Sequence, residues 1–99
     1  MIVVLTREAE SDLDAIADYV ARDSMPAALK LVDDIKEKCL ALAHAPRAWP
    51  LVPRYEHHGI RRRPFGNYLV FYRIGREAVE VVHILHGARD YEALLFPER

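Results

Sequence analysis

Two consecutive stretches of the sequence carry apolar residues at the period of an α-helix, with only a short break between them. In residues 7–22 these residues recur every three or four positions, at Ala9, Leu13, Ile16 and Val20. Residues 28–42 repeat the spacing, at Ala28, Val32, Ile35, Cys39 and Leu42. The pattern predicts two amphipathic helices. Because the break at 23–26 is so short, the helices have to form an antiparallel hairpin.

The ends of both helices carry local signals. Thr6 is a good N-cap residue, and acidic residues follow it in the first turn, where carboxylates stabilise a helix. Pro26 fits only near a helix start, so the second helix is predicted to begin beside it, behind Ser24 or Met25. Pro46 is predicted to end this helix.

The rest of the chain is dominated by β-strand signals. Four short runs are rich in apolar, β-branched and aromatic residues, namely 2–5, 60–65, 68–74 and 79–86. Glycine-containing breaks separate the last three runs, which predicts an antiparallel meander. Pro64 cannot donate to a β-ladder, so its run should lie at a sheet edge or end there. Residues 46–58 are predicted to be irregular, and residues 88–95 to form one or two helical turns.

The order strand, helix, helix, strand, strand, strand defines the fold class. It predicts an α+β two-layer domain, with the helical hairpin on one face of a single antiparallel sheet and a short helix at the C-terminus. A chain of 99 residues, of which 52% are hydrophobic, is the right size for a single core. We therefore expect one domain over residues 1–99.

The predicted sheet has apolar residues on both faces. In residues 68–74 the apolar side chains point alternately to the two sides, and one helical layer covers only one of them. A partner chain is therefore predicted to cover the other face. The alternative is that the C-terminal segment with Leu94, Leu95 and Phe96 folds back over it.

Charge and composition exclude several classes of function. Fourteen basic residues against fifteen acidic ones give a net charge of −1, which argues against a general nucleic-acid binder. No apolar run approaches the roughly 20 residues that a membrane crossing needs. The single cysteine, Cys39, has no internal disulfide partner, and acidic residues follow the N-terminus too soon for a secretory signal. We expect a cytoplasmic protein that does not associate with membranes.

Motifs for metal or covalent chemistry are weak. His83 and His86 lie three residues apart, which on a strand places them on opposite faces, and no cysteine pair completes a four-ligand set. Cys39 falls in an apolar stripe and is predicted to be a buried hydrophobe rather than a nucleophile. The sequence contains no GxSxG, P-loop or GxGxxG motif. No metal and no cofactor is therefore expected.

Arginines concentrate in the second half of the sequence, where all eight basic residues of 51–99 are arginine. If several of them converge with histidine or tyrosine, arginine would stabilise a phosphodiester transition state while the other groups move protons. The alternative is that they form an exposed sheet edge and serve solubility. The constellation consists of Arg61, Arg62, Arg63, Arg73, His83, His86, Arg89 and Tyr91.

Three stretches stand in a recognisable order along the chain. They are LTREAESDLDAIADY at residues 5–19, IRRRPFGNYLVFYR at 60–73 and ILHGARD at 84–90. Together they resemble the ParE branch of the RelE/ParE superfamily of bacterial type II toxin–antitoxin toxins, and the resemblance covers nearly the whole chain. It implies the fold predicted above, and a growth-inhibiting toxin that is neutralised by a small cognate antitoxin.

The resemblance implies a different target for each branch. RelE-like toxins cleave messenger RNA on the ribosome, whereas ParE-like toxins are described as blocking DNA gyrase without nuclease activity. RelE-like nucleases carry an arginine directly after the tyrosine that opens the central strand, and here Leu69 follows Tyr68. Arg89 matches a nuclease arginine, but the C-terminal tyrosine position falls near Leu95, and Tyr91 lies too early. The resemblance favours a gyrase inhibitor that is not an enzyme, with a RelE-like endoribonuclease as the alternative.

The resemblance also implies candidate contact residues. An antitoxin segment folding against the toxin would supply the second cover of the sheet, and Leu69, in place of the nuclease arginine, would face this open side. The antitoxin-binding candidates are then Leu69, Phe71, Arg73, His83 and Leu85. The candidates for contacts with gyrase are Arg61, Arg62, Arg63, Arg73, Arg89 and Tyr91.

Overall fold

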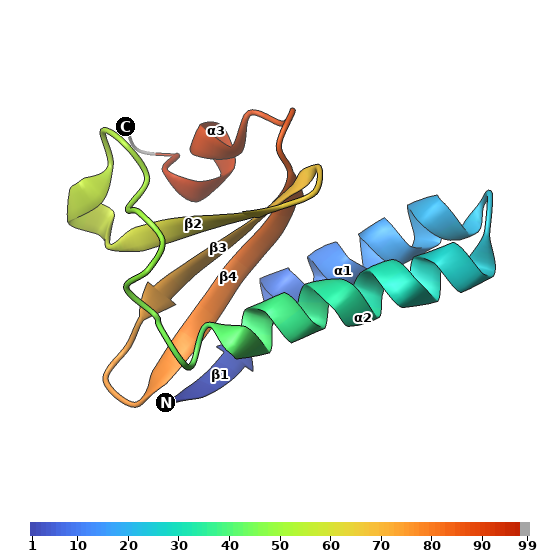
Figure 1. Ribbon diagram of the computed structural model, residues 1–99. Coiled ribbons are helices and arrows are strands. Elements are labelled where there is room, and N and C mark those ends of the chain that lie inside the picture. Colours follow the sequence, from blue (N-terminus) through green and yellow to red (C-terminus); the bar gives the residue numbers. More distant parts are fainter. Residues whose placement is uncertain (98–99) are drawn as a thin grey trace.

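The computed structural model describes residues 1–97, which form a four-stranded sheet with a helical hairpin on one face (Figure 1). No helix in this part of the chain is long and apolar enough to cross a membrane. The elements are β1 (Ile2–Leu5), α1 (Arg7–Ala21), α2 (Met25–Ala41), the 3-10 turn η1 (Glu56–His58), β2 (Ile60–Phe65), β3 (Tyr68–Ile74), β4 (Ala78–His86) and α3 (Tyr91–Leu95).

The helical hairpin begins where the capping signals predict. The Thr6 hydroxyl accepts a hydrogen bond from the Ala9 amide, and the Ser24 hydroxyl accepts one from Ala27. The predicted C-terminus of the second helix is wrong, because α2 ends at Ala41, well before Pro46. Over residues 42–44 each amide bonds to the carbonyl three residues earlier. This tightening of the last turn satisfies carbonyls that a helix end leaves free.

The sheet has the strand order β1-β4-β3-β2. The meander of β2, β3 and β4 is antiparallel, as predicted, and β2 with Pro64 lies at the sheet edge. The expectation of an entirely antiparallel sheet is wrong, because β1 pairs parallel with β4 over Ala78–Val81. The whole helical hairpin and two strands separate β1 from β4, and no local pattern encodes the direction of such a long-range pairing.

The first hydrophobic core lies between the sheet and the helical hairpin. It contains the residues of β3 and β4 that face α1 and α2. Cys39 of α2 is fully buried in this core, as predicted. Its buried members are Ala9, Leu13, Ile35, Cys39, Leu42, Val70, Tyr72, Val79, Val81 and Ile84. Alternate residues of β3 therefore pack on the helices, in agreement with the period of the sequence.

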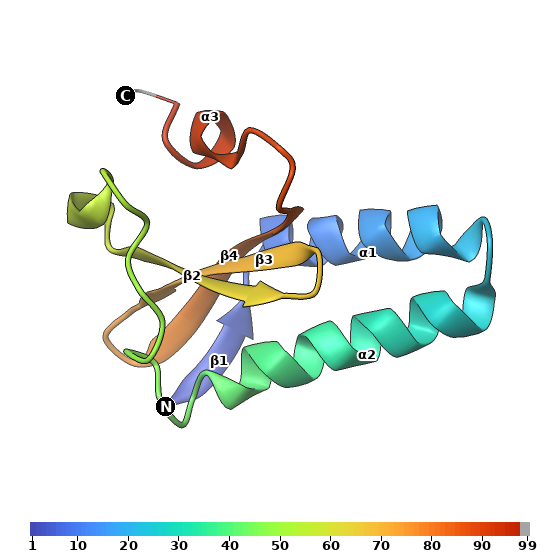
Figure 2. The same ribbon diagram turned by 45° about the horizontal axis from the view of Figure 1, so that its top comes forward.

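A second hydrophobic core covers the other face of the sheet, where α3 and the segment before β2 lie (Figure 2). Phe71 is 0% exposed and Leu85 is 2% exposed, and both pack with Val52, Ile60 and Phe96. The predicted open face is therefore wrong for these two residues. The C-terminal segment folds back over the sheet instead, which is the alternative left open above, because it brings Phe96 onto apolar surface that water would otherwise contact.

Aromatic and ionic contacts hold the irregular segment and the C-terminus together. The Tyr55 ring stacks on Phe96 with centroids 4.1 Å apart. Arg54 forms an ion pair with Glu92 of α3 at 2.9 Å, and the buried Tyr72 donates its hydroxyl proton to the Pro46 carbonyl. Residues 46–58 are thus fixed by side chains, with η1 as their one regular turn.

Burial of Cys39 predicts a loss of stability at high pH. Desolvation raises the pKa of its thiol from 9.0 to about 11, although the nearby Arg63 lowers it slightly. Between these two values the unfolded chain loses a proton that the folded chain keeps, so stability falls as pH rises, by about 2–3 kcal/mol in all. Desolvation also raises the pKa of Tyr72. Urea unfolding from pH 8.5 upward should show this loss, and Cys39→Ala should show a shallower one; an equally steep dependence in the variant would contradict it.

Candidate functional site

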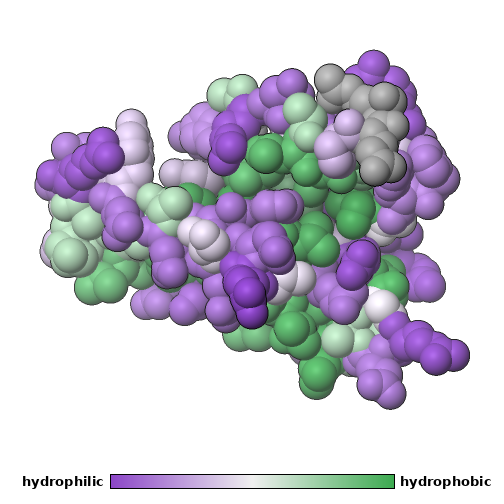
Figure 3. Space-filling model, turned by 180° about the vertical axis from the view of Figure 1, so that it is seen from behind, coloured by the Kyte–Doolittle hydropathy of each residue, from purple (hydrophilic) through white to green (hydrophobic). Residues whose placement is uncertain are grey.

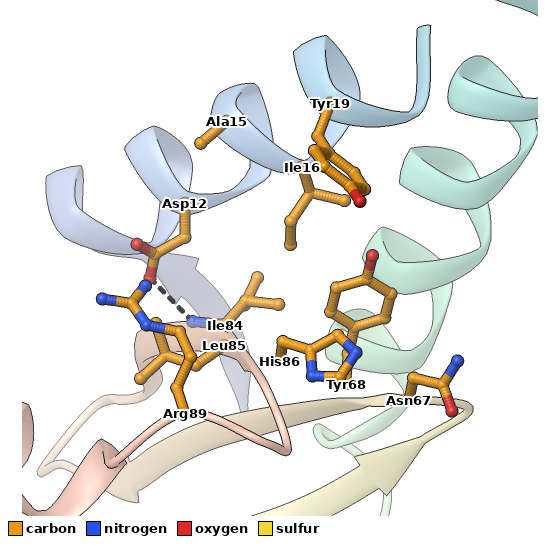
Figure 4. A pocket seen from close by; sticks show the side chains of 10 residues that line it. All are labelled: Asp12, Ala15, Ile16, Tyr19, Asn67, Tyr68, Ile84, Leu85, His86 and Arg89. Carbon is orange, nitrogen blue, oxygen red and sulfur yellow. Dashed lines mark hydrogen bonds between the residues drawn. The ribbon is translucent and has the colours of Figure 1, made fainter. Parts of the chain in front are cut away.

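A hollow of the surface lies between α1, the start of β3 and the end of β4. It has a volume of about 520 Å³, within the range of sites that bind a ligand or a partner's side chains. Figure 4 shows its lining, which comes from α1, the β2–β3 turn, the first residue of β3, the end of β4 and the segment after β4. We call it the α1 groove; it is lined by Asp12, Ala15, Ile16, Tyr19, Asn67, Tyr68, Ile84, Leu85, His86 and Arg89.

One end of the α1 groove is polar. The Asp12 carboxylate accepts a hydrogen bond from the Ile84 amide at 2.8 Å and lies 2.8 Å from Nδ1 of His83. Because β1 pairs with β4 only as far as Val81, Asp12 satisfies an amide on the unpaired part of this strand edge. In Figure 4 the Arg89 guanidinium points toward this carboxylate. The polar end thus presents both signs of charge.

The other end of the α1 groove is aromatic. Tyr19 is 66% exposed, and Tyr68 meets His86 edge to face with ring centroids 5.6 Å apart. In Figure 4 the hydroxyl ends of Tyr19 and Tyr68 both lie at this end of the hollow. Exposed aromatic rings beside an apolar floor of Ile16 and Ile84 are typical of protein-binding surfaces.

The antitoxin-binding residues proposed from the sequence do not form one surface. Phe71 and Leu85 belong to the second core, and Leu69 packs partly against it. Arg73 is exposed but forms an ion pair with Glu80 at 2.6 Å. His83 and Arg73 line one small hollow beneath α3, whereas Leu85 reaches the α1 groove. The prediction depended on an open sheet face that the C-terminal segment closes.

The target-binding arginines also point in different directions. Arg61 and Arg63 lie on the helix side of β2, since their partners in the ladder are Tyr72 and Val70. Arg62 points to the opposite face and donates to the Tyr91 hydroxyl at 2.7 Å. The structure therefore brings Arg62 and Tyr91 together, while Arg73 and Arg89 lie elsewhere. All three arginines of residues 61–63 are half-buried, which corrects the expectation of a fully exposed edge.

The Arg62–Tyr91 hydrogen bond should help to hold α3 on the sheet. Tyr91→Phe removes only the hydroxyl, so the half-buried guanidinium loses its acceptor, and we expect the free energy of unfolding to fall by about 1–2 kcal/mol. Tyr55→Phe is the matched control, because the Tyr55 hydroxyl makes no hydrogen bond within residues 1–97. Urea denaturation of both variants measures the difference; equal stabilities would contradict a contribution from this bond.

The sequence patterns described above did not predict the α1 groove, although the sequence contains a signal for it. Asp12, Ile16 and Tyr19 have the spacing i, i+4, i+7, so they share one face of α1 at the flank of the apolar stripe. On this face of α1 an exposed tyrosine lies beside a half-buried carboxylate, a combination that indicates a binding surface rather than a purely solvated face. No three metal-ligating side chains come together anywhere in residues 1–97.

The sequence pattern described as "ParE toxin of type II toxin-antitoxin system, parDE" matches residues 3–91. The chain belongs to the ParE toxin family. This match includes both helices, all four strands and the start of α3, and confirms the resemblance stated for the sequence. A comparison with curated protein sequences gives no match.

Two solved structures have the ParE-like fold of this chain. The chromosomal ParDE toxin–antitoxin system from P. aeruginosa is 29% identical in sequence, with a TM-score of 0.73 over 87% of this chain and 95% of that one. The RelBE2 toxin–antitoxin complex from Mycobacterium tuberculosis is 22% identical, with a TM-score of 0.64 over 86% and 95%. The second likeness concerns the fold alone. Membership of the ParE family makes this chain a toxin of a type II toxin–antitoxin system.

Proposed function

We propose that this ParE-family toxin inhibits growth by binding DNA gyrase in the cytoplasm, and that it does not cleave RNA. The observation that carries the proposal is Leu69, which follows Tyr68 where the resemblance places a nuclease arginine. Leu69 is an aliphatic residue that packs partly into the second core, so it supplies no charge to a phosphodiester. The hydroxyl of Tyr91 accepts a hydrogen bond from Arg62 and is thus engaged within the chain.

Two assays on the purified toxin test this target. We expect the toxin to inhibit supercoiling by gyrase, or to accumulate cleaved DNA, while a reconstituted translation reaction keeps its messenger RNA intact. The reverse result, ribosome-dependent cleavage of messenger RNA with gyrase unaffected, would replace the proposal with the RelE-like endoribonuclease alternative. Neither activity would require a metal or cofactor from this chain.

We further propose that the α1 groove is the docking site of an amphipathic segment of the cognate antitoxin. The second sheet face already has its cover in residues 91–96, so that face offers a partner little apolar surface. Figure 3, the view from behind Figure 1, shows patches of hydrophobic residues separated by hydrophilic ones. The α1 groove combines exposed aromatic rings, an apolar floor and charges at one end, which suits an amphipathic chain.

A further inference from the structure

Basic side chains line the sheet edge beside the C-terminal half of α2. Arg63 lies over the Trp49 ring, with its guanidinium carbon 4.6 Å from the centroid, and the Lys38 ammonium lies 5.7 Å from the centroid of Phe65. Arg61 donates to the Trp49 carbonyl at 2.6 Å and to the Arg47 carbonyl at 3.4 Å. We call this surface the β2 basic edge; it consists of Lys38, Arg47, Arg61 and Arg63. Figure 2 shows the strand β2 above the helix α2.

The charges of the β2 basic edge are not neutralised by acidic residues. The contacts of Lys38, Arg61 and Arg63 are with aromatic rings and carbonyl oxygens, which are uncharged. Within residues 1–97 no carboxylate forms an ion pair with any of the four residues, whereas Lys30, Arg54 and Arg73 each pair with one. A row of uncompensated cations creates a local positive field although the whole chain has a net charge of −1.

This field reaches groups buried in the first core. Arg63 lowers the pKa of the Cys39 thiol against the larger effect of desolvation, and Arg61 and Arg63 do the same for Tyr72. Both titratable groups belong to the first core, and Tyr72 is the ladder partner of Arg61. An anion placed outside the same guanidinium groups would be attracted by the same charges.

We propose that the β2 basic edge binds the phosphate backbone of a nucleic-acid strand. Arg61 and Arg63 stand two residues apart on one side of β2, about 7 Å along the strand, which is comparable to the separation of neighbouring phosphates. Guanidinium groups recognise phosphate oxygens through paired N–H donors. The contact does not read sequence, and with so few cations its affinity is modest.

The composition of the surface favours nucleic acid over an acidic protein segment. None of the strongly exposed large hydrophobic residues lies in residues 43–65, which supply Arg47, Arg61 and Arg63, although Leu40 of α2 is 59% exposed. This stretch therefore lacks the apolar centre of a protein interface. Interfaces with nucleic acid are more polar and more positive. The inference is independent of the choice between gyrase and ribosome, because both of these targets carry nucleic acid.

Fluorescence anisotropy of a short labelled single strand tests the proposal on the purified toxin without gyrase. We expect the strand to bind at low salt. The logarithm of the binding constant should fall with log[salt] with a slope of about −2, which corresponds to three phosphate contacts on a single strand. Lys38→Gln combined with Arg63→Gln should weaken binding at least about tenfold and make the slope shallower by about 1 to 1.5. DNA and RNA strands of the same sequence distinguish the two sources of phosphate.

The control variant changes the net charge by the same amount as Lys38→Gln with Arg63→Gln does, but at positions away from the β2 basic edge. Arg7→Gln with Arg22→Gln removes two exposed cations at the ends of α1 and should leave affinity and slope near those of the parent. Lys38→Gln alone retains the Arg63–Trp49 contact, and thermal melting verifies that each variant is folded. Absence of binding at low salt, equal binding by the double variant, or equally effective displacement by a polyglutamate of matched charge would each overturn the proposal.

Discussion

Phe71→Asp is expected to leave the isolated chain unfolded. The Phe71 side chain is 0% exposed and lies in the second core with Leu85 and Phe96. The substitution removes an aromatic ring, which costs about 3–5 kcal/mol in a core, and places a carboxylate without a partner in apolar surroundings, which costs several more. A domain of this size has about 5–15 kcal/mol of stability in total. Circular dichroism of the purified variant should show the loss of regular structure.

Leu94→Asp is the matched control for this prediction. Leu94 belongs to the C-terminal segment that also contains Phe96, but its side chain is 44% exposed. A carboxylate at this position stays in water, and we expect the free energy of unfolding to change by no more than about 1 kcal/mol. The comparison of the two variants shows whether Phe71 is buried in the chain's own core or lies on a face that is open to a partner. A Phe71→Asp protein that folds and melts like the parent would mean that residues 91–96 do not cover the sheet in solution.

The helical hairpin and the meander were predictable because their signals are local. Thr6 and Ser24 cap the helices that follow them, and the period of the apolar residues defines each buried face. The cover of the second face was not predictable in the same way. The sequence identifies an apolar face, but a partner and the chain's own C-terminus satisfy that need equally well, and only the packing of Phe96 against Phe71 distinguishes them.

The arginine run illustrates a similar limit. A strand sends Arg61 and Arg63 to one face and Arg62 to the other, which the sequence alone allows one to derive. Their partners Trp49 and Tyr91, however, come from residues on either side of the meander, and their contacts depend on how two irregular segments return to the sheet. Charge clustering along a sequence therefore overstated how far these side chains share a surface.

The α1 groove combines residues that are distant in the sequence. Its Asp12 and Tyr19 come from α1, whereas Tyr68 begins β3 and Arg89 follows β4, at the same end of the β3–β4 pair. The hollow lies where β1 has already ended at Leu5, so that the last residues of β4 pair with β3 on one side and have α1 in place of a strand on the other. Strand length thus determines the site, and strand length is among the features that local patterns define least well.

Ala15→Arg is expected to abolish binding of the cognate antitoxin while the toxin still folds. Ala15 is an exposed α1 residue that lines the α1 groove, so a long side chain there occupies the hollow without entering a core. Arginine is also a good helix former, so the helix itself should tolerate it. Blocking the centre of an interface typically costs at least 2–3 kcal/mol, which corresponds to about a hundredfold loss of affinity.

Ala27→Arg provides the control for this loss. Ala27 is likewise an exposed helical alanine, but it lies in the first turn of α2 and does not line the α1 groove. Co-purification of each variant with the antitoxin, beside its melting temperature alone, separates lost binding from lost folding. If Ala15→Arg binds the antitoxin as tightly as Ala27→Arg does, the antitoxin docks elsewhere. Both substitutions add the same charge and volume to an exposed helical alanine. A difference in antitoxin binding between the two variants would therefore result from the position of Ala15 in the α1 groove.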